Sequence, residues 1–410
     1  MKTFYYLIIL IFISNFAASC GNDNDSPIII DEEEPLTVVT KAGIIKANET
    51  WTANKIYILG GKVVVDDGVT LTIEAGTIVK GAEGQGSLAS ALIVDQGGKL
   101  IAEGTTAKPI IFTSVLDNIK IGQKAGTNLS FSDDGLWGGL IVLGKAPISV
   151  SGDVATKQIE GIPATDTFGQ YGGNVANDNS GVYKYISIRH GGITIGADNE
   201  INGLTLGGVG SGTTIDHIEI VANQDDAIEI FGGSVNVTNI LTWAQGDDGL
   251  DFDQAWSGSI KNALVILGVD SDSALEFDGP EGSAAKEAGF TIENITLKGA
   301  GTSSKYADLR DGLIANMKNV LAYGFSVDSK VKVNGADSAT ELANGRITFS
   351  NWQIVLPVGV TIGSLITGAK LGDEVKFTNN ATSIASPSAA TVGANTSLFS
   401  WTYAASKSAY

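Results

Sequence analysis

One repeated pattern in the middle of the chain constrains the fold more than any other feature. Its three copies, within residues 213–282, read TTIDHIEIVANQDDAIEIFGG, SVNVTNILTWAQGDDGLDFDQAWSG and SIKNALVILGVDSDSALEFDGPEG. Superposing them aligns Ile228 with Leu250 and Leu275, so the pattern recurs at steps of 22 and 25 residues. A repeat of this length, built from short alternating segments, is typical of the coils of a solenoid. We therefore predict an all-β solenoid in which each copy forms one coil.

A second pattern indicates which solenoid this is. Six aligned segments begin with a residue that recurs from coil to coil, and four of the six are asparagines: Tyr185, His217, Asn239, Asn262, Asn294 and Asn319. Asparagine tolerates the left-handed backbone conformation and can hydrogen-bond to the backbone of the next coil, so an internal asparagine ladder can satisfy a buried turn. We expect His217 to be structural for the same reason. Coils of about 22–25 residues with such a ladder resemble the single-stranded right-handed parallel β-helix.

The N-terminus has the features of a secretory signal. One positive charge precedes an apolar run that is short for a membrane span, which indicates a signal peptide at residues 1–19. Residues 17–20 resemble a bacterial lipobox, in which Cys20, the single cysteine, becomes lipidated. The acidic residues that follow resemble the surface-export signal of Bacteroidota lipoproteins. We expect residues 20–36 to be an acidic tether from an outer membrane, with the mature protein on the cell surface.

The rest of the chain divides by the regularity of its pattern. We expect a parallel β-helix over residues 37–335, with an excursion out of the stack between about 117 and 178, where the sequence is polar and aperiodic. The segment WGGLIVLGKAPI within it predicts a pair of strands. Residues 336–410 are expected to form final irregular coils and a C-terminal cap. Within them DEVKFTNN predicts a further strand, and SLFSWTY predicts the segment that covers the end of the stack.

Charge narrows the classes of partner. The formal net charge of −19 argues against nucleic acid and anionic lipid surfaces as ligands, because both are polyanions. It is compatible with cations, neutral glycans or basic partners. A secreted chain with one cysteine has no internal disulfides, so its stability must come from buried apolar area and backbone pairing.

Acidic residues also repeat in register. If Ile228 and its equivalents point inward, the alternation places five carboxylates on the outer face of neighbouring strands about 4.8 Å apart: Glu229, Asp251, Asp253, Glu276 and Asp278. Like charges on adjacent strands destabilise a sheet. Three interpretations follow: a solvated acidic face, a site for a hard cation such as Ca²⁺, or a set of catalytic carboxylates.

The catalytic interpretation depends on two Asp-Asp pairs, Asp225/Asp226 and Asp247/Asp248, each of which opens a strand. They resemble the paired acids of polygalacturonase-type glycoside hydrolases. The other motifs of those enzymes, an Asn-Thr-Asp triplet and a Gly-His-Gly, do not match residues 202–204 and 257–259. A lyase would need a basic residue beside a calcium cluster, and we expect none to align with the acidic positions, since Arg189 and Arg310 lie coils away.

Aromatic residues accompany the acids. Phe231 is predicted to point outward at the position of Asp253, and Trp243 and Trp256 lie within the same coils. Exposed rings beside carboxylates are typical of a sugar-binding face, whereas core packing or coverage of a sheet is the alternative.

From the lipobox through DDAIEIFGG and GDDGLDFDQAWSG to the closing FSWTY, the chain resembles a family of Bacteroidota surface lipoproteins whose members often carry the label "multidrug transporter". That resemblance implies a β-helix lipoprotein. We do not carry the transporter label over, because no apolar run of spanning length follows Cys20. We therefore expect an outer-membrane binding or structural module that meets a glycan or a partner protein, with Ca²⁺ as a possible aid. The alternative is a polysaccharide-degrading enzyme of the β-helix type.

Overall fold

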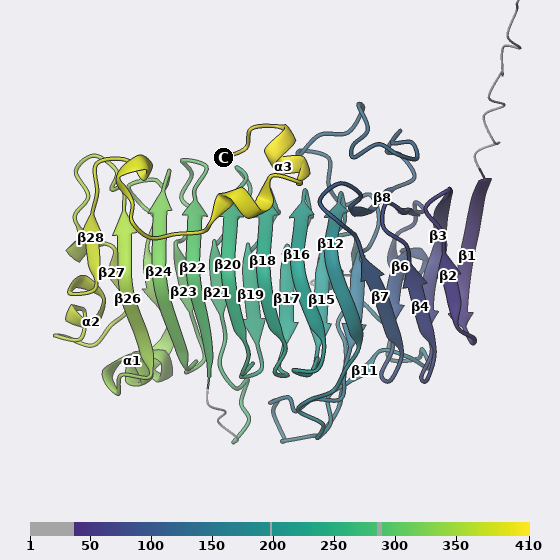
Figure 1. Cartoon of the computed structure of the whole chain (residues 1–410). Coiled ribbons are helices and arrows are strands. Elements are labelled where there is room, and N and C mark those ends of the chain that lie inside the picture. Colours follow the sequence, from purple (N-terminus) through teal and green to yellow (C-terminus); the bar gives the residue numbers. More distant parts are fainter. Residues whose placement is uncertain (1–36, 197–198, 285–288) are drawn as a thin grey trace, which may run out of the picture. The chain divides into compact units, whose positions relative to one another are not determined.

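The computed structural model describes residues 37–196, 199–284 and 289–410. The predicted signal peptide, the lipidation site Cys20 and the acidic tether lie outside these residues. All described strands except two short antiparallel pairs stack into a long parallel β-helix, as the repeat predicts (Figure 1). No helix in the described part of the chain is both long enough and apolar enough to cross a membrane.

The stack has three rows of parallel strands, and each long strand bends so that its two halves belong to different rows. The long strands are β1 (Thr37–Ile45), β3 (Lys55–Val65), β12 (Gly181–Arg189), β16 (Thr214–Val221), β18 (Asn236–Trp243), β20 (Ser259–Ile266), β22 (Phe290–Lys298), β24 (Ala315–Tyr323) and β26 (Ile347–Ile354). Short strands that belong to the same rows as these halves, outside the row described next, are β2 (Glu49–Trp51), β4 (Thr70–Ile73), β7 (Lys99–Glu103), β5 (Ile78–Gly81), β8 (Ile110–Ser114) and β28 (Ala381–Ser383). The row that carries the acidic residues consists of β6 (Ala91–Val94), β9 (Leu140–Leu143), β15 (Leu204–Gly207), β17 (Ile228–Phe231), β19 (Leu250–Asp253), β21 (Leu275–Phe277), β23 (Ala307–Leu309), β25 (Val331–Val333) and β27 (Ile366–Thr367).

In the long strands from β12 to β26, the bend falls on the predicted ladder position. The strands β1 and β3 bend at other places, where their pairing shifts near Gly43 and Gly61. All six predicted residues have φ between 50° and 68°, and Asn351 of β26 extends the series with a φ of 58°. Asn262 Nδ2 donates to Asn239 Oδ1 at 2.8 Å, and Asn351 Nδ2 donates to Asn319 Oδ1 at 3.0 Å. The His217 ring stacks on the Tyr185 ring with centroids 4.2 Å apart, which supports the structural role expected for His217.

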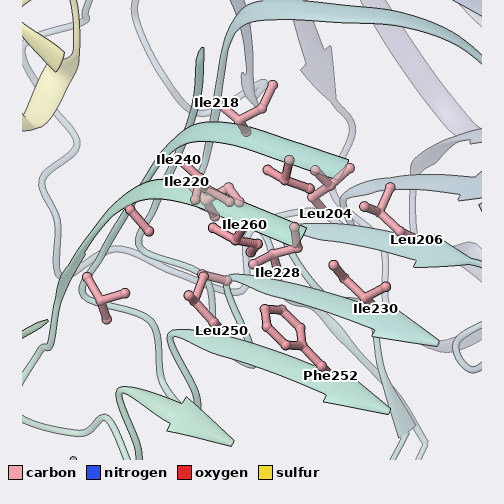
Figure 2. Packing of buried hydrophobic residues seen from close by; sticks show 14 of the residues in the cluster. Leu204, Leu206, Ile218, Ile220, Ile228, Ile230, Ile240, Leu250, Phe252 and Ile260 are labelled. Atoms are coloured by element: carbon pink, nitrogen blue, oxygen red, sulfur yellow. The ribbon is translucent and has the colours of Figure 1, made fainter. Parts of the chain in front are cut away.

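Inside the stack, the alternating apolar residues form one continuous core (Figure 2). Ile228, Leu250 and Leu275 are fully buried in it, as the alignment of the repeats predicts. Phe252 stacks on Phe277 with ring centroids 4.6 Å apart, so identical positions of successive coils contact each other directly. The interior is therefore filled by side chains.

The excursion leaves the stack as predicted, but it folds back over the row of β15 and β17. Its one stacked strand is β9, so the pair of strands predicted for residues 137–148 is wrong; a short antiparallel pair, β10 (Lys157–Gln158) and β11 (Gln170–Tyr171), follows it. A second pair is formed by β13 (Thr194–Gly196) and β14 (Asn199–Glu200). Tyr171 packs on Phe231 with centroids 6.0 Å apart, and its hydroxyl hydrogen-bonds to Gln254. The outer face of this row is consequently covered.

The C-terminal part corrects two predictions. The coils continue through β26, β27 and β28, with a helix α1 (Gly335–Ala343) between β25 and β26 that the sequence did not predict. DEVKFTNN forms the helix α2 (Val375–Thr378) and not a strand. The short 3₁₀ helices are η1 (Gly86–Leu88), η2 (Ile362–Ser364), η3 (Pro387–Ala389) and η4 (Thr396–Phe399), and the last helix is α3 (Tyr403–Ser406).

SLFSWTY does not cover the end of the stack. It belongs to a segment, residues 391–410, that runs along the side of the coils back towards β16 and that we call the C-terminal strap (Figure 1, yellow). Phe399 and Tyr403 of the strap pack on Val221, Leu241 and Leu264. These outward apolar residues need a cover along the side of the coils, which explains the position of the strap.

Candidate functional site

The predicted acidic positions do stack on one face. Glu229 pairs in register with Asp251, and Asp251 pairs with Glu276, on the adjacent strands β17, β19 and β21. Asp253 and Asp278 continue the neighbouring column of the same face. We call these five residues the acidic row. The expectation that the row is exposed is wrong, because its side chains are only 6–9% exposed beneath the excursion and the turns.

One end of the acidic row is neutralised by arginine. Arg310 Nη1 lies 2.5 Å from Glu276 Oε1, and Arg310 Nε donates to Asp278 Oδ2 at 2.8 Å. The expectation that no basic residue aligns with the row is therefore wrong. Arg310 follows β23, whose Asp308 pairs in register with Glu276. The sequence contains a sign of this contact, because Ala307, Asp308, Leu309 and Arg310 alternate like the acidic strands before them. The alignment of repeats missed it, because Asp308 follows its partner Glu276 by 32 residues and not by 22 or 25.

The other end of the row has no such partner. Asp226, Glu229 and Asp251 each place a carboxylate oxygen within 4.8 Å of the other two, and all three side chains are buried. We call this set the buried triad. Among the described residues, no lysine, arginine or histidine forms an ion pair with any of its members. Asp251 Oδ1 has no hydrogen-bond donor, and the same holds for the amide oxygen of Asn202, whose Nδ2 donates to Glu229 Oε2.

Burial and mutual repulsion perturb every carboxyl group of the triad. Burial raises the pKa of Glu229 well above its usual value, and the charges of Asp253 and Asp226 raise it further. The pKa values of Asp226 and Asp251 are raised in the same direction, first by burial and then by neighbouring carboxylates. Two charges 4.8 Å apart repel by roughly 3 kcal/mol at an effective dielectric constant near 20. The triad must therefore hold protons or a cation.

The Asp-Asp pairs occupy the turns that precede β17 and β19, and their two members differ. Asp226 Oδ1 accepts the backbone N–H of Asp248 at 2.8 Å, and Asp248 Oδ1 accepts that of Ser273 at 2.6 Å. These second members tie successive turns together. The first members, Asp225 and Asp247, lie nearer the surface; burial and the charge of Asp247 raise the pKa of Asp225 to about 7.

The paired aspartates do not have the separation of an inverting glycoside hydrolase. Oxygens of Asp225, Asp226 and Asp247 lie within 4.8 Å of one another, whereas the inverting mechanism leaves room for a water between carboxyl groups about 6.5–9.5 Å apart. A crowded group of carboxylate oxygens is better suited to holding a cation. Burial is the main cause that raises the pKa of Asp248 to about 11, which would keep its carboxyl group protonated at neutral pH.

An oxygen-only set suits a hard cation. Ca²⁺ takes six to eight oxygen ligands with flexible geometry, and carboxylates and amide carbonyls both serve. Of the residues predicted as metal ligands, the structure brings together Glu229 and Asp251, and it adds Asp226, which the sequence suggested only for catalysis. Glu276 and Asp278 are taken by Arg310, so the predicted ligand set is divided.

The aromatic residues predicted to bind a sugar are not exposed. Phe231, Trp243 and Trp256 are 6%, 8% and 1% exposed. Trp256 packs in the interior against Phe252, with ring centroids 4.6 Å apart. Phe131 covers Trp243 at 4.7 Å, so neither tryptophan offers an open ring face to a sugar.

The fold and the site define a class: a parallel β-helix whose acidic outer row is covered by its own loops. More specifically, the chain belongs to the family of pectate-lyase-like β-helix domains, which it matches over residues 43–406. No curated protein and no solved structure shows significant similarity to it. Membership of this family agrees with the fold, and it is compatible with either a binding domain or an enzyme that cleaves polysaccharides.

Proposed function

We propose that this chain is a binding module without catalytic activity, whose β-helix is locked by a divalent cation held by Asp226, Glu229 and Asp251. The observation that carries the proposal is the contrast between the two ends of the acidic row. Arg310 neutralises one end, whereas the buried triad at the other end crowds three carboxylates without a basic partner among the described residues. A bound cation would supply the missing charge.

Ca²⁺ is the cation that the ligand chemistry favours. Mg²⁺ demands a near-octahedral geometry and gives up its waters reluctantly, whereas Ca²⁺ accepts irregular, crowded carboxylates. The amide oxygen of Asn202, which has no donor, offers a neutral fourth ligand. The set contains no sulfur or imidazole, which argues against a preference for zinc or copper.

The cation would act on the scaffold, not on a ligand. The triad joins β17, β19 and the turn before β17, so an ion there would cross-link two coils beneath the excursion. A glycan or a protein partner would then meet a surface outside the covered row. We further propose that a lipid on Cys20 holds this module at the outer membrane, where such a partner would be met.

Thermal unfolding of the mature protein with and without Ca²⁺ tests this function. At a hundredfold excess over Kd, a ligand specific for the folded state adds about 2.7 kcal/mol, so the Tm should rise by several degrees in Ca²⁺ relative to EDTA at matched ionic strength. Asp251→Asn should abolish the rise and leave the metal-free protein at least as stable, because a neutral amide removes repulsion.

The exposed Asp328 provides the matched control, since Asp328→Asn also removes one carboxylate but should keep the full response to Ca²⁺. No shift at millimolar Ca²⁺, or a shift that survives Asp251→Asn, would contradict the proposal.

A polysaccharide lyase is the second candidate, and the position of Arg310 favours it. A lyase needs a basic residue beside acidic residues, and Arg310 contacts Glu276 and Asp278. However, although burial lowers the pKa of Arg310, these two carboxylates together outweigh burial and raise it, which makes Arg310 a poor base. Formation of unsaturated products from acidic polysaccharides that is lost in Arg310→Lys and Asp248→Asn, while the fold is retained, would favour the lyase over the binding module.

A further inference from the structure

A hollow of about 200 Å³ lies on the side of the stack, and no residue of the buried triad lines it. It forms where the end of β18 and the turn after β20 meet the excursion. Its lining includes Phe131, Asp134, Trp243, Leu267, Val269 and Asp270. None of these residues belongs to the acidic row, so this hollow is a separate feature of the surface.

The hollow has an apolar wall that is open to solvent. Phe131 stacks on the buried Trp243 at 4.7 Å and remains 46% exposed, and Val269 is 70% exposed. The stack fixes the Phe131 ring on a rigid base, because Trp243 in turn packs against Tyr403 of the C-terminal strap at 6.1 Å. Exposed apolar side chains on a firm base form a surface that a flat or elongated apolar group can cover.

Two carboxylates line the hollow beside this wall, those of Asp134 and Asp270, and neither is paired with a basic side chain of the described residues. They are close enough that the negative charge of Asp270, after burial, raises the pKa of Asp134. A positive group placed between them would relieve this repulsion.

We propose that the hollow receives an arginine side chain of a partner protein. A planar guanidinium can lie on the Phe131 ring while its N–H groups donate to Asp134 and Asp270, and its methylene stem covers Val269. A neutral sugar would leave both carboxylates uncompensated. The net charge of −19 favours the approach of a basic partner over that of an acidic one. This inference is independent of the cation proposed above.

The test uses ¹⁹F NMR of the mature protein labelled with 5-fluorotryptophan, in which Trp243→Phe assigns the Trp243 signal. The probe is the peptide acetyl-Gly-Arg-Gly-amide, and its control is the same peptide with citrulline, which has the shape of arginine without the charge. We expect the arginine peptide to shift the Trp243 signal saturably, and the citrulline peptide to bind at least tenfold more weakly.

The double variant Asp134→Asn/Asp270→Asn should weaken arginine binding at least tenfold, whereas the control Asp328→Asn should not change it. Equal binding of the citrulline peptide would overturn the proposal, as would unchanged affinity of the double variant. A saturable shift caused by Ca²⁺ alone that blocks the peptide would also overturn it, because the hollow would then be a metal site.

Discussion

At the scale of single residues, two buried polar side chains of similar shape, Asn262 and Asp251, have opposite surroundings. Asn262 is placed at the bend of β20, where its left-handed φ of 68° suits asparagine and both ends of its amide find partners. Asp251 is placed one sheet away with an oxygen that has no donor. Buried polar atoms without partners are rare in folded proteins, so Asn262 completes a structural ladder, whereas the unsatisfied oxygen of Asp251 is the feature on which the proposed cation site rests.

Asn262→Ala should lower the free energy of unfolding by about 2–3 kcal/mol. Alanine is strained in the left-handed backbone conformation, and it cannot make the hydrogen bonds to Asn239 and Asn395. Asn262→Gly keeps the backbone conformation at little strain and loses only the hydrogen bonds, so it should be less destabilising. Urea denaturation measures both. Equal losses would show that the bend itself contributes nothing.

At the scale of elements, the C-terminal strap is held by a buried charge. Glu219 is fully buried; its Oε2 accepts the backbone N–H of Tyr403 at 3.0 Å and its Oε1 that of Ala404 at 2.8 Å. Arg189 lies beneath the strap, with its Nη2 3.7 Å from Glu219 Oε2 and its Cζ 4.7 Å from the centre of the Tyr403 ring. The strap therefore closes over an ion pair that would otherwise meet water.

Glu219→Ala should lower the free energy of unfolding by about 3–5 kcal/mol. It leaves Arg189 buried without its acidic partner, and two backbone N–H groups of the strap lose their hydrogen-bond acceptor. Thermal unfolding and limited trypsin digestion, which should release the strap faster, would measure the effect. The exposed pair of Glu103 with Lys184 supplies the control, since Glu103→Ala should cost less than about 1 kcal/mol. If both variants lost a similar amount of unfolding free energy, Glu219 would not be the residue that holds the strap.

At the scale of the whole molecule, the raised pKa values make stability depend on pH. Asp225, with a pKa of about 7, and Asp248, at about 11, bind protons more tightly in the folded state than in the unfolded one. Their contribution is therefore fully present below pH 4 and is lost as the pH rises towards the folded pKa. Asp133 and Asp216, with lowered pKa values, act in the opposite direction but are less buried.

The metal-free protein should accordingly have a higher Tm at pH 5 than at pH 8, measured by calorimetry in EDTA. Asp226, Glu229 and Asp251 also have raised pKa values, and the proposed cation would replace the protons of these three groups. Ca²⁺ should therefore restore part of the loss at pH 8. A metal-free protein that becomes more stable between pH 5 and pH 8 would contradict the buried, crowded state of these carboxyl groups.

The repeat in the sequence determined the coil, its register and the inward positions of Ile228, Leu250 and Leu275, because alternation and coil length are local properties of the chain. It also placed the acidic residues in one row. Only the tertiary structure decided that this row is buried, since the covering excursion and Arg310 come from other parts of the sequence. The same holds for the strap, whose SLFSWTY packs on β16 and β18. Contacts between segments far apart in sequence depend on how loops return to the stack, and no local periodicity encodes that return.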